Sequence, residues 1–193
     1  MNLISRLKLD GFQEGLSTER FGKIIFFKPT VTSTNEWAKK LADCGAEEGT
    51  ITFAAQQTAG RGRLGRTWIS PKGGLWFSII LHPNLSISEV TKLVFMASLA
   101  VSRVLRHKYR VRTETKWPND VLVCGRKICG ILAETSISDS KLNYVILGIG
   151  LNANVHADKF LNVHNASQAT SIQAELGRKI RLLDLLGALL EEM

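Results

Sequence analysis

Residues 75–81 read LWFSIIL, a nearly unbroken apolar run that predicts a strand buried on both faces of a sheet. The longest helical stretch follows it, from about Glu89 to Lys108, with apolar residues along one stripe. Before it, Thr50–Gln57 predicts a second strand, and Lys23–Lys28 a shorter one that we expect Pro29 to close. Strands that alternate with helices in this way predict a sheet with helices packed on it.

The flanking segments extend this pattern. A short helix is expected from about Asn35 to Asp43, and an amphipathic helix from Leu182 to Leu190. Further strands are expected at about 111–116, 121–123, 128–134 and 144–151. Because no repeat or low-complexity linker breaks the order, we expect an N-terminal extension over residues 1–22 and one α/β (α+β) domain over residues 23–193.

Composition limits the class of protein. With 193 residues, of which 45% are hydrophobic, the chain can bury one core. Its formal net charge of +8 suits an anionic partner, such as a nucleotide, a nucleic acid or an acidic protein surface. Three cysteines are too few for a disulfide framework, and no apolar run approaches the roughly 20 residues that cross a bilayer. Because the N-terminal residues also lack a secretory signal, we expect a cytoplasmic protein without a membrane partner.

The first chemically informative stretch is GRGRLGRTW, residues 60–68. Its glycines let the backbone approach a ligand closely, and Arg61, Arg63 and Arg66 supply forked donors that suit phosphate or carboxylate. A solvated basic turn, or an RGG-type nucleic-acid segment, would have the same composition. The loop is not a Walker A motif, because it lacks the GxxxxGK[ST] pattern.

Two further stretches carry polar residues at strand ends, where functional residues often lie. KWPND, residues 116–120, presents an asparagine and an aspartate, and Lys127 could return to the same place across a hairpin. GIGLNAN, residues 148–154, follows a buried strand and combines two glycines with Asn152, which can bind a base or a ribose. Taken singly, each stretch also fits an ordinary Asn-Asp turn or a glycine-punctuated strand end.

Together and in this order, these stretches resemble the catalytic domain of the biotin protein ligase family. The family's motifs are matched by Ser-Thr-Asn at 33–35, Gln-x-Ala-Gly-Arg-Gly-Arg-x-Gly-Arg-x-Trp at 57–68, Lys-Trp-Pro-Asn-Asp at 116–120, the lysine at 127 and Gly-Ile-Gly-x-Asn at 148–152. The resemblance runs from about residue 23 to residue 190. It implies a mixed sheet flanked by helices, related to the class II aminoacyl-tRNA synthetase and lipoate ligase cores.

The resemblance implies an ATP-dependent biotin–protein ligase. Such an enzyme activates biotin to biotinyl-AMP, releases pyrophosphate, and transfers biotin to a lysine of a biotin carboxyl carrier protein. Because biotin and ATP are both anions, bringing them together requires cations, here arginines, a lysine and Mg²⁺. The biotin ureido ring needs donors and acceptors, which hydroxyl and amide side chains provide.

The resemblance also assigns residues to these roles. Biotin would be bound by Ser33, Thr34, Asn35, Gln57, Arg61, Gly62, Arg63 and Lys127. ATP would be bound by Arg63, Arg66, Trp68, Asn119, Asp120, Lys127 and Asn152, with Asp120 also holding Mg²⁺. Of these residues, Arg63 and Lys127 are the expected catalytic pair.

Two departures and two alternatives accompany the resemblance. Members of the family commonly end in a small β-barrel domain, and some begin with a winged-helix domain. From residues 1–193 we expect neither of these domains, and we expect no specific DNA binding. A homodimer stays open. A lipoate–protein ligase would share the chemistry, but the full GRGRxGR pattern argues against it. A basic nucleic-acid-binding module is the other alternative, disfavoured by 7% aromatic content and the lack of an RNP-like strand.

Overall fold

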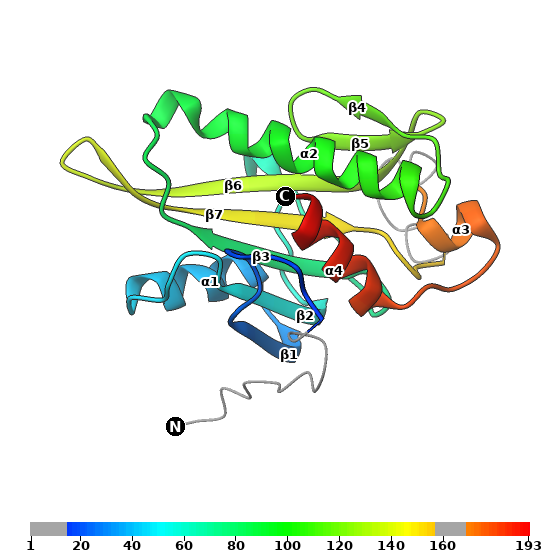
Figure 1. Ribbon diagram of the computed structural model, residues 1–193, viewed down its shortest axis with the longest axis horizontal. Coiled ribbons are helices and arrows are strands. Elements are labelled where there is room, and N and C mark those ends of the chain that lie inside the picture. The colour runs from blue at the N-terminus through cyan, green and yellow to red at the C-terminus, as the bar shows by residue number, and fades with distance from the viewer. Residues whose placement is uncertain (1–14, 157–168) are drawn as a thin grey trace.

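The computed structural model describes residues 15–156 and 169–193, so the expectations for residues 1–14 and 157–168 lie outside the described residues. Within the described ranges, seven strands form one sheet in the order β1-β2-β3-β7-β6-β5-β4 (Figure 1). Their bounds are β1 Ile25–Val31, β2 Ile51–Gln57, β3 Leu75–Leu81, β4 Glu114–Lys116, β5 Asp120–Val123, β6 Arg126–Ser138 and β7 Lys141–Leu151. Strands β1 and β2 are parallel and every other neighbouring pair is antiparallel, so the expected mixed sheet is confirmed.

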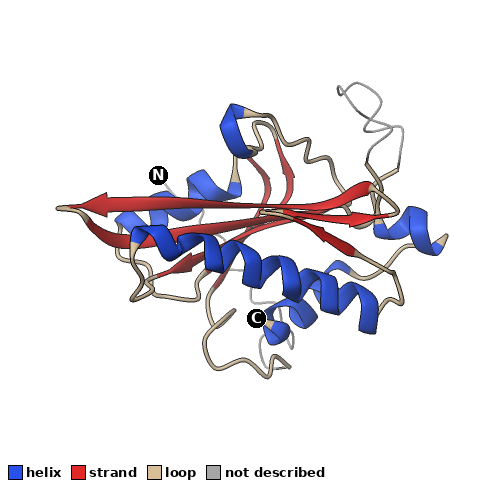
Figure 2. Ribbon diagram, turned by 90° about the horizontal axis from the view of Figure 1, so that it is seen from above, coloured by secondary structure: helices blue, strands red, loops and turns tan. Residues whose placement is uncertain are grey.

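Helices cover both faces of this sheet. They are α1 Thr34–Asp43, α2 Val90–His107, α3 Ile172–Leu176 and α4 Leu182–Glu192, with the short 3-10 turns η1 Arg63–Gly65 and η2 Ile87–Glu89. The long helix α2 and helix α4 lie on one face, and α1 lies on the other (Figure 2). None of the helices in the described part of the chain is long and apolar enough to cross a membrane.

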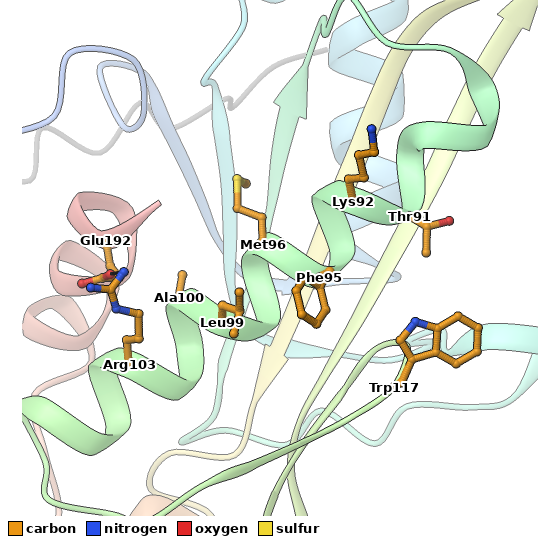
Figure 3. A pocket seen from close by; sticks show the side chains of 9 residues that line it. All are labelled: Thr91, Lys92, Phe95, Met96, Leu99, Ala100, Arg103, Trp117 and Glu192. Carbon is orange, nitrogen blue, oxygen red and sulfur yellow. Dashed lines mark ion pairs between the residues drawn. The ribbon is translucent and has the colours of Figure 1, made fainter.

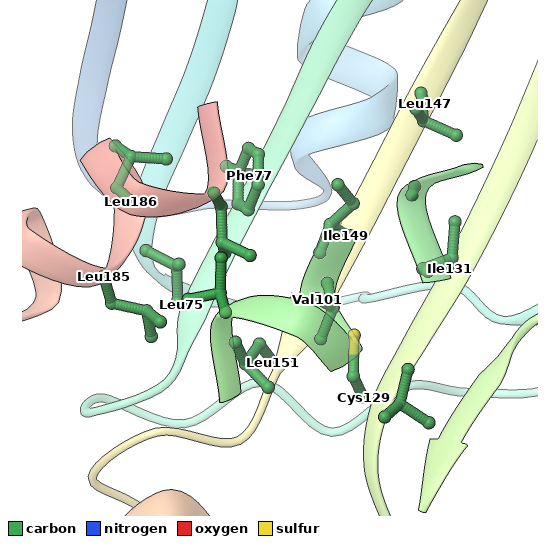
Figure 4. Packing of buried hydrophobic residues seen from close by; sticks show 14 of the residues in the cluster. Leu75, Phe77, Val101, Cys129, Ile131, Leu147, Ile149, Leu151, Leu185 and Leu186 are labelled. Atoms are coloured by element: carbon green, nitrogen blue, oxygen red, sulfur yellow. The ribbon is translucent and has the colours of Figure 1, made fainter. Parts of the chain in front are cut away.

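The position of strand β3 between helices on both faces of the sheet explains why its sequence is apolar at successive positions. Leu75 and Phe77 point into the main core, where they lie near Leu185 of α4 (Figure 4). Ile80, on the opposite face, packs with Ala38 of α1. Because helices cover both faces, every residue of β3 is buried, as the sequence predicted.

Two expected boundaries are wrong. Pro29 does not close the first strand, because β1 continues to Val31 and pairs with β2 on either side of the proline. Strand β1 lies at the edge of the sheet, where a residue without a backbone N–H can be tolerated. The strand expected over 111–116 is shorter than predicted: β4 begins at Glu114, while Val111 belongs to the core.

Candidate active site

The three motif stretches meet on the α1 face of the sheet. Ten of the sequence-predicted residues line one cavity there: Ser33, Thr34, Asn35, Gln57, Arg61, Gly62, Arg63, Trp68, Asn119 and Lys127. The wall is completed by residues of β6 and β7, namely Gly130, Ile131, Leu132, Gly148, Ile149 and Gly150. Residues as far apart in the sequence as Ser33 and Gly150 thus contribute to one site.

Glycines of β6 and β7 form the floor of the cavity. A Cβ atom at Gly148 would lie 2.0 Å from Asn35 Oδ1, and one at Gly150 would lie 2.4 Å from Trp68 Nε1. Gly130 pairs with Gly150 across the strands and also lies against the Trp68 ring. The sequence suggested that glycines here let a ligand approach the backbone; in the structure, the groups that approach it are side chains of the site itself.

Hydroxyl and amide groups at the start of α1 form a buried network. The backbone N–H of Thr34 donates to Gln57 Oε1 at 2.8 Å, and Gln57 Nε2 donates to Ser70 Oγ at 2.7 Å. Ser78 Oγ lies 2.8 Å from Thr34 Oγ1 and 2.6 Å from Asn35 Oδ1. Because Asn35 is only 4% exposed, these hydrogen bonds fix its side chain at the cavity wall.

Three members of the network were not predicted as site residues from the sequence: Ser70, Ser78 and Glu134. Ser78 lies in the middle of the apolar strand β3 and is buried. A polar residue inside an apolar strand was the one feature of the sequence that could have pointed to its role. Glu134 on β6 accepts a hydrogen bond from Asn35 Nδ2 at 2.7 Å and forms an ion pair with Arg61 at 3.4 Å. The sequence offered no comparable signal for Glu134, which is the last residue of the strand expected over 128–134.

Cationic groups gather beside this network. Lys127 Nζ lies 2.6 Å from Asp120 Oδ1 and 5.0 Å from the centre of the Trp68 ring. Arg63 Nη1 donates to Asn119 Oδ1 at 3.0 Å, so the arginine loop and the KWPND stretch are in direct contact. The Trp68 indole N–H is buried and has no hydrogen-bond partner among the described residues. The arrangement places cations where an anion could bind, next to polar groups that could bind a neutral ring.

Asp120 is the only one of these residues predicted as a magnesium ligand. No group of three or more His, Cys, Asp or Glu side chains that could enclose a metal occurs within the described ranges. Mg²⁺ that is bound together with nucleotide phosphates needs only one or two protein carboxylates. Asp120 fits that limited role, provided that its contact with Lys127 rearranges.

Three predicted ATP-binding residues do not line the cavity. One is Asp120, which contacts the cavity residue Lys127. Arg66 is exposed on the loop. Asn152 is buried, and its Nδ2 donates to the carbonyl of Thr170 at 2.9 Å, which ties the segment before α3 to the end of β7. Their contacts with a nucleotide stay predictions. Cys129, below the site on the core face of β6, is no nucleophile, because burial raises the pKa of its thiol far above the usual range.

A second, apolar groove of about 450 Å³ lies over α2 (Figure 3). Phe95 and Leu99 line it, together with Trp117, which is 77% exposed. Trp117 belongs to the KWPND stretch, yet it lines this groove and not the polar cavity. The walls of this groove offer mainly aromatic and aliphatic contacts, and Lys92 and the Arg103–Glu192 ion pair also line it.

Comparisons with known proteins agree with this geometry. The family model described as "Biotin/lipoate A/B protein ligase family" matches residues 27–152. The bifunctional ligase/repressor BirA of Bacillus spizizenii is 38% identical over 167 residues, covering 86% of this chain and 51% of that protein. The biotin–[acetyl-CoA-carboxylase] ligase of Paracoccus denitrificans is 37% identical over 159 residues, covering 80% of this chain and 66% of that protein.

Solved structures show the same fold. The biotin protein ligase from Aquifex aeolicus in complex with biotin and ATP superimposes with a TM-score of 0.73 at 31% identity, covering 89% of this chain and 68% of that one. The chain spans about half the length of the Bacillus relatives that it matches, 51% in each case. The family match covers more than half of the chain and coincides with the residues that build the cavity, and the chain therefore belongs to the biotin/lipoate A/B protein ligase family.

Proposed function

We propose that this chain carries the catalytic domain of a biotin–protein ligase. In this reaction ATP activates biotin to biotinyl-AMP with release of pyrophosphate, and the biotinyl group then passes to a lysine of a biotin carboxyl carrier protein. The observation that carries the proposal is the juxtaposition of a buried hydroxyl and amide network with Lys127 and Arg63 in one cavity. Relatives named as biotin ligases, and the Aquifex structure with biotin and ATP, support it.

The polar network suits the ureido ring of biotin. That ring has two N–H donors and one carbonyl acceptor, so its pocket must supply both kinds of partner. Thr34 and Gln57 supply hydroxyl and amide groups, and Asn35 supplies a second amide. The dithiolane ring of lipoate has no such groups, so it would make none of the hydrogen bonds that a ureido ring could make with this pocket, which is a basis for discrimination.

The cationic end suits the first chemical step. A carboxylate oxygen of biotin attacks the α-phosphorus of ATP, a new O–P bond forms, and the bond to the pyrophosphate oxygen breaks. Lys127 and Arg63 neutralise the two anions as they approach and stabilise the charge that develops on the phosphate oxygens. When bound with the nucleotide, Mg²⁺ would offset charge on the departing pyrophosphate, and Asp120 is the residue to hold it.

In the second step, the ε-amine of the acceptor lysine attacks the acyl carbon of the mixed anhydride and AMP departs. Water would destroy this anhydride, so the site must exclude it. The loop at 60–66 lines the cavity through Arg61, Gly62 and Arg63, and it is the segment we expect to exclude water. We place the reaction in the cytoplasm, which keeps cysteines reduced. A homodimer stays a prediction that sedimentation would test.

Biotin-dependent exchange of pyrophosphate into ATP tests the proposal. We expect exchange with biotin and Mg-ATP, and at least about a hundredfold less with lipoate, because the polar pocket rejects the dithiolane ring. Exchange driven by lipoate and not by biotin would establish the lipoate ligase alternative. Absence of both exchange reactions, together with salt-sensitive filter binding of nucleic acid, would favour the basic-module alternative.

A further inference from the structure

Glu134 connects the polar pocket to the arginine loop. It lies on β6, and its side chain is 35% exposed. One carboxylate oxygen, Oε2, accepts a hydrogen bond from Asn35 Nδ2 at 2.7 Å and lies 3.4 Å from the guanidinium of Arg61. A single atom of Glu134 therefore contacts both the side chain that faces the pocket and the loop that stands over it.

The contact with Glu134 decides which way the Asn35 amide faces. The two ends of an asparagine amide have nearly the same shape, so hydrogen-bond partners determine the orientation. A carboxylate can only accept, and the end of Asn35 that faces Glu134 must therefore be the NH₂ group. This leaves Asn35 Oδ1 toward Ser78, at 2.6 Å, as an acceptor.

The same constraint passes along the network. Ser78 has one hydroxyl hydrogen, and the acceptor at Asn35 Oδ1 takes it. Ser78 Oγ then has only lone pairs to offer Thr34 Oγ1, which lies 2.8 Å away. Thr34 also has a single hydroxyl hydrogen, and two acceptors lie within reach of it: Ser78 Oγ and Gln57 Oε1, the latter at 3.1 Å. A charge on β6 thus favours Asn35 Oδ1 as the acceptor and Ser78 as its donor.

We propose that Glu134 is a positioning residue that orients the Asn35 amide, and through it the Ser78 hydroxyl, and holds Arg61 at the cavity wall. The inference rests on the proposed function, because the pattern it sets is the one that a ureido ring would meet. Glu134 itself does not line the cavity, so it acts through its two partners.

The substitution Glu134→Gln tests this with almost no change in shape. A glutamine can turn either end of its amide toward Asn35, so only the more distant Leu132 carbonyl oxygen, 3.5 Å from Asn35 Nδ2, still favours the original orientation. Arg61 also loses its counter-charge. We expect the KM for biotin to rise about tenfold, the effect of one weakened hydrogen bond to a charged group. We expect kcat to change by less than about threefold, because binding in the ground state and in the transition state weakens alike. Trypsin should also cut the ligand-free protein faster after Arg61.

Glu192→Gln is the matched control. Glu192 on α4 is 28% exposed and pairs with Arg103 at 3.0 Å, so this variant also removes one partly exposed ion pair, but outside the site. The tenfold rise in KM together with faster tryptic cleavage in Glu134→Gln, but not in Glu192→Gln, supports the inference. Equal KM and equal cleavage rates in the two variants overturn it.

A second variant and a measurement without ligand cover the cases in which Glu134→Gln does not fold or the chain shows no exchange. If Glu134→Gln does not give a cooperative thermal transition, Glu134→Asp takes its place; a KM at least about threefold above that of the control supports the inference, and a KM equal to the control overturns it. If the wild-type chain shows no biotin-dependent exchange, the proposed function fails. The cleavage comparison without ligand still reports whether Glu134 holds Arg61, so the two failures are distinguishable.

Discussion

Replacing Gly148 with alanine should displace Asn35 from the pocket. The added Cβ would lie 2.0 Å from Asn35 Oδ1 and 2.8 Å from its Cγ, far inside van der Waals contact. The smaller conformational freedom of the unfolded alanine chain favours folding by about 0.4–1 kcal/mol. Overpacking of a filled site costs about 1–3 kcal/mol, and a buried polar group that loses its partner costs about 1–3 kcal/mol. These two costs exceed the gain from the alanine, and we expect a net loss of about 2 kcal/mol in the free energy of unfolding.

A double-mutant cycle with Asn35→Ala identifies the cause of that loss. Urea denaturation gives the free energy of unfolding for the wild type, both single variants and the double variant. In the Asn35→Ala background the methyl group at position 148 meets no amide, so Gly148→Ala should cost little there. We expect a coupling energy of about 2 kcal/mol. Losses that simply add would refute the reasoning, because the methyl group would then be acting on some other neighbour.

Three other predictions follow from the site. Lys127→Ala should lower biotin-dependent pyrophosphate exchange by about a hundredfold or more. It should cost at most about 1 kcal/mol of stability, because Lys127 is a partly exposed cation. Exchange within about tenfold of the wild-type rate would remove Lys127 from the mechanism. Trypsin should cut the loop at 60–66 early in the free protein and more slowly with biotin and Mg-ATP, and equal rates would rule out a closing loop. Iodoacetamide should label two thiols in the folded protein and three after unfolding, because Cys129 is buried and its pKa is raised; three labels in the folded state would contradict this.

The fold was largely predictable because its signals are local. The run at 75–81 is apolar on both faces, and the structure covers both faces of that strand. The apolar stripe predicted a helix from about Glu89 to Lys108, and α2 begins and ends within one residue of these bounds. Pro29 misled the prediction because its effect depends on whether its strand is central or at an edge, and strand order is not a local property.

The site was predictable only in part, for a related reason. Ten of the residues predicted to bind biotin or ATP line the cavity. Ser78 and Glu134 were missed because their roles depend on the strand register, which sets Ser78 opposite Gly148 and Glu134 opposite Ile146. A serine in an apolar run and a glutamate near the end of a strand have no special meaning until their neighbours across the sheet are known.

The same register explains why binding and stability are coupled in this site. Gly130 and Gly150 face each other across β6 and β7, and glycines inside strands weaken a sheet by about 0.5–1 kcal/mol each relative to alanine. The hollow they leave is filled by Trp68, and the hollow at Gly148 is filled by Asn35. These two side chains therefore pack the sheet and line the cavity at once. A loss of activity in a variant of either one reports on binding only when it is measured under conditions where the variant is fully folded.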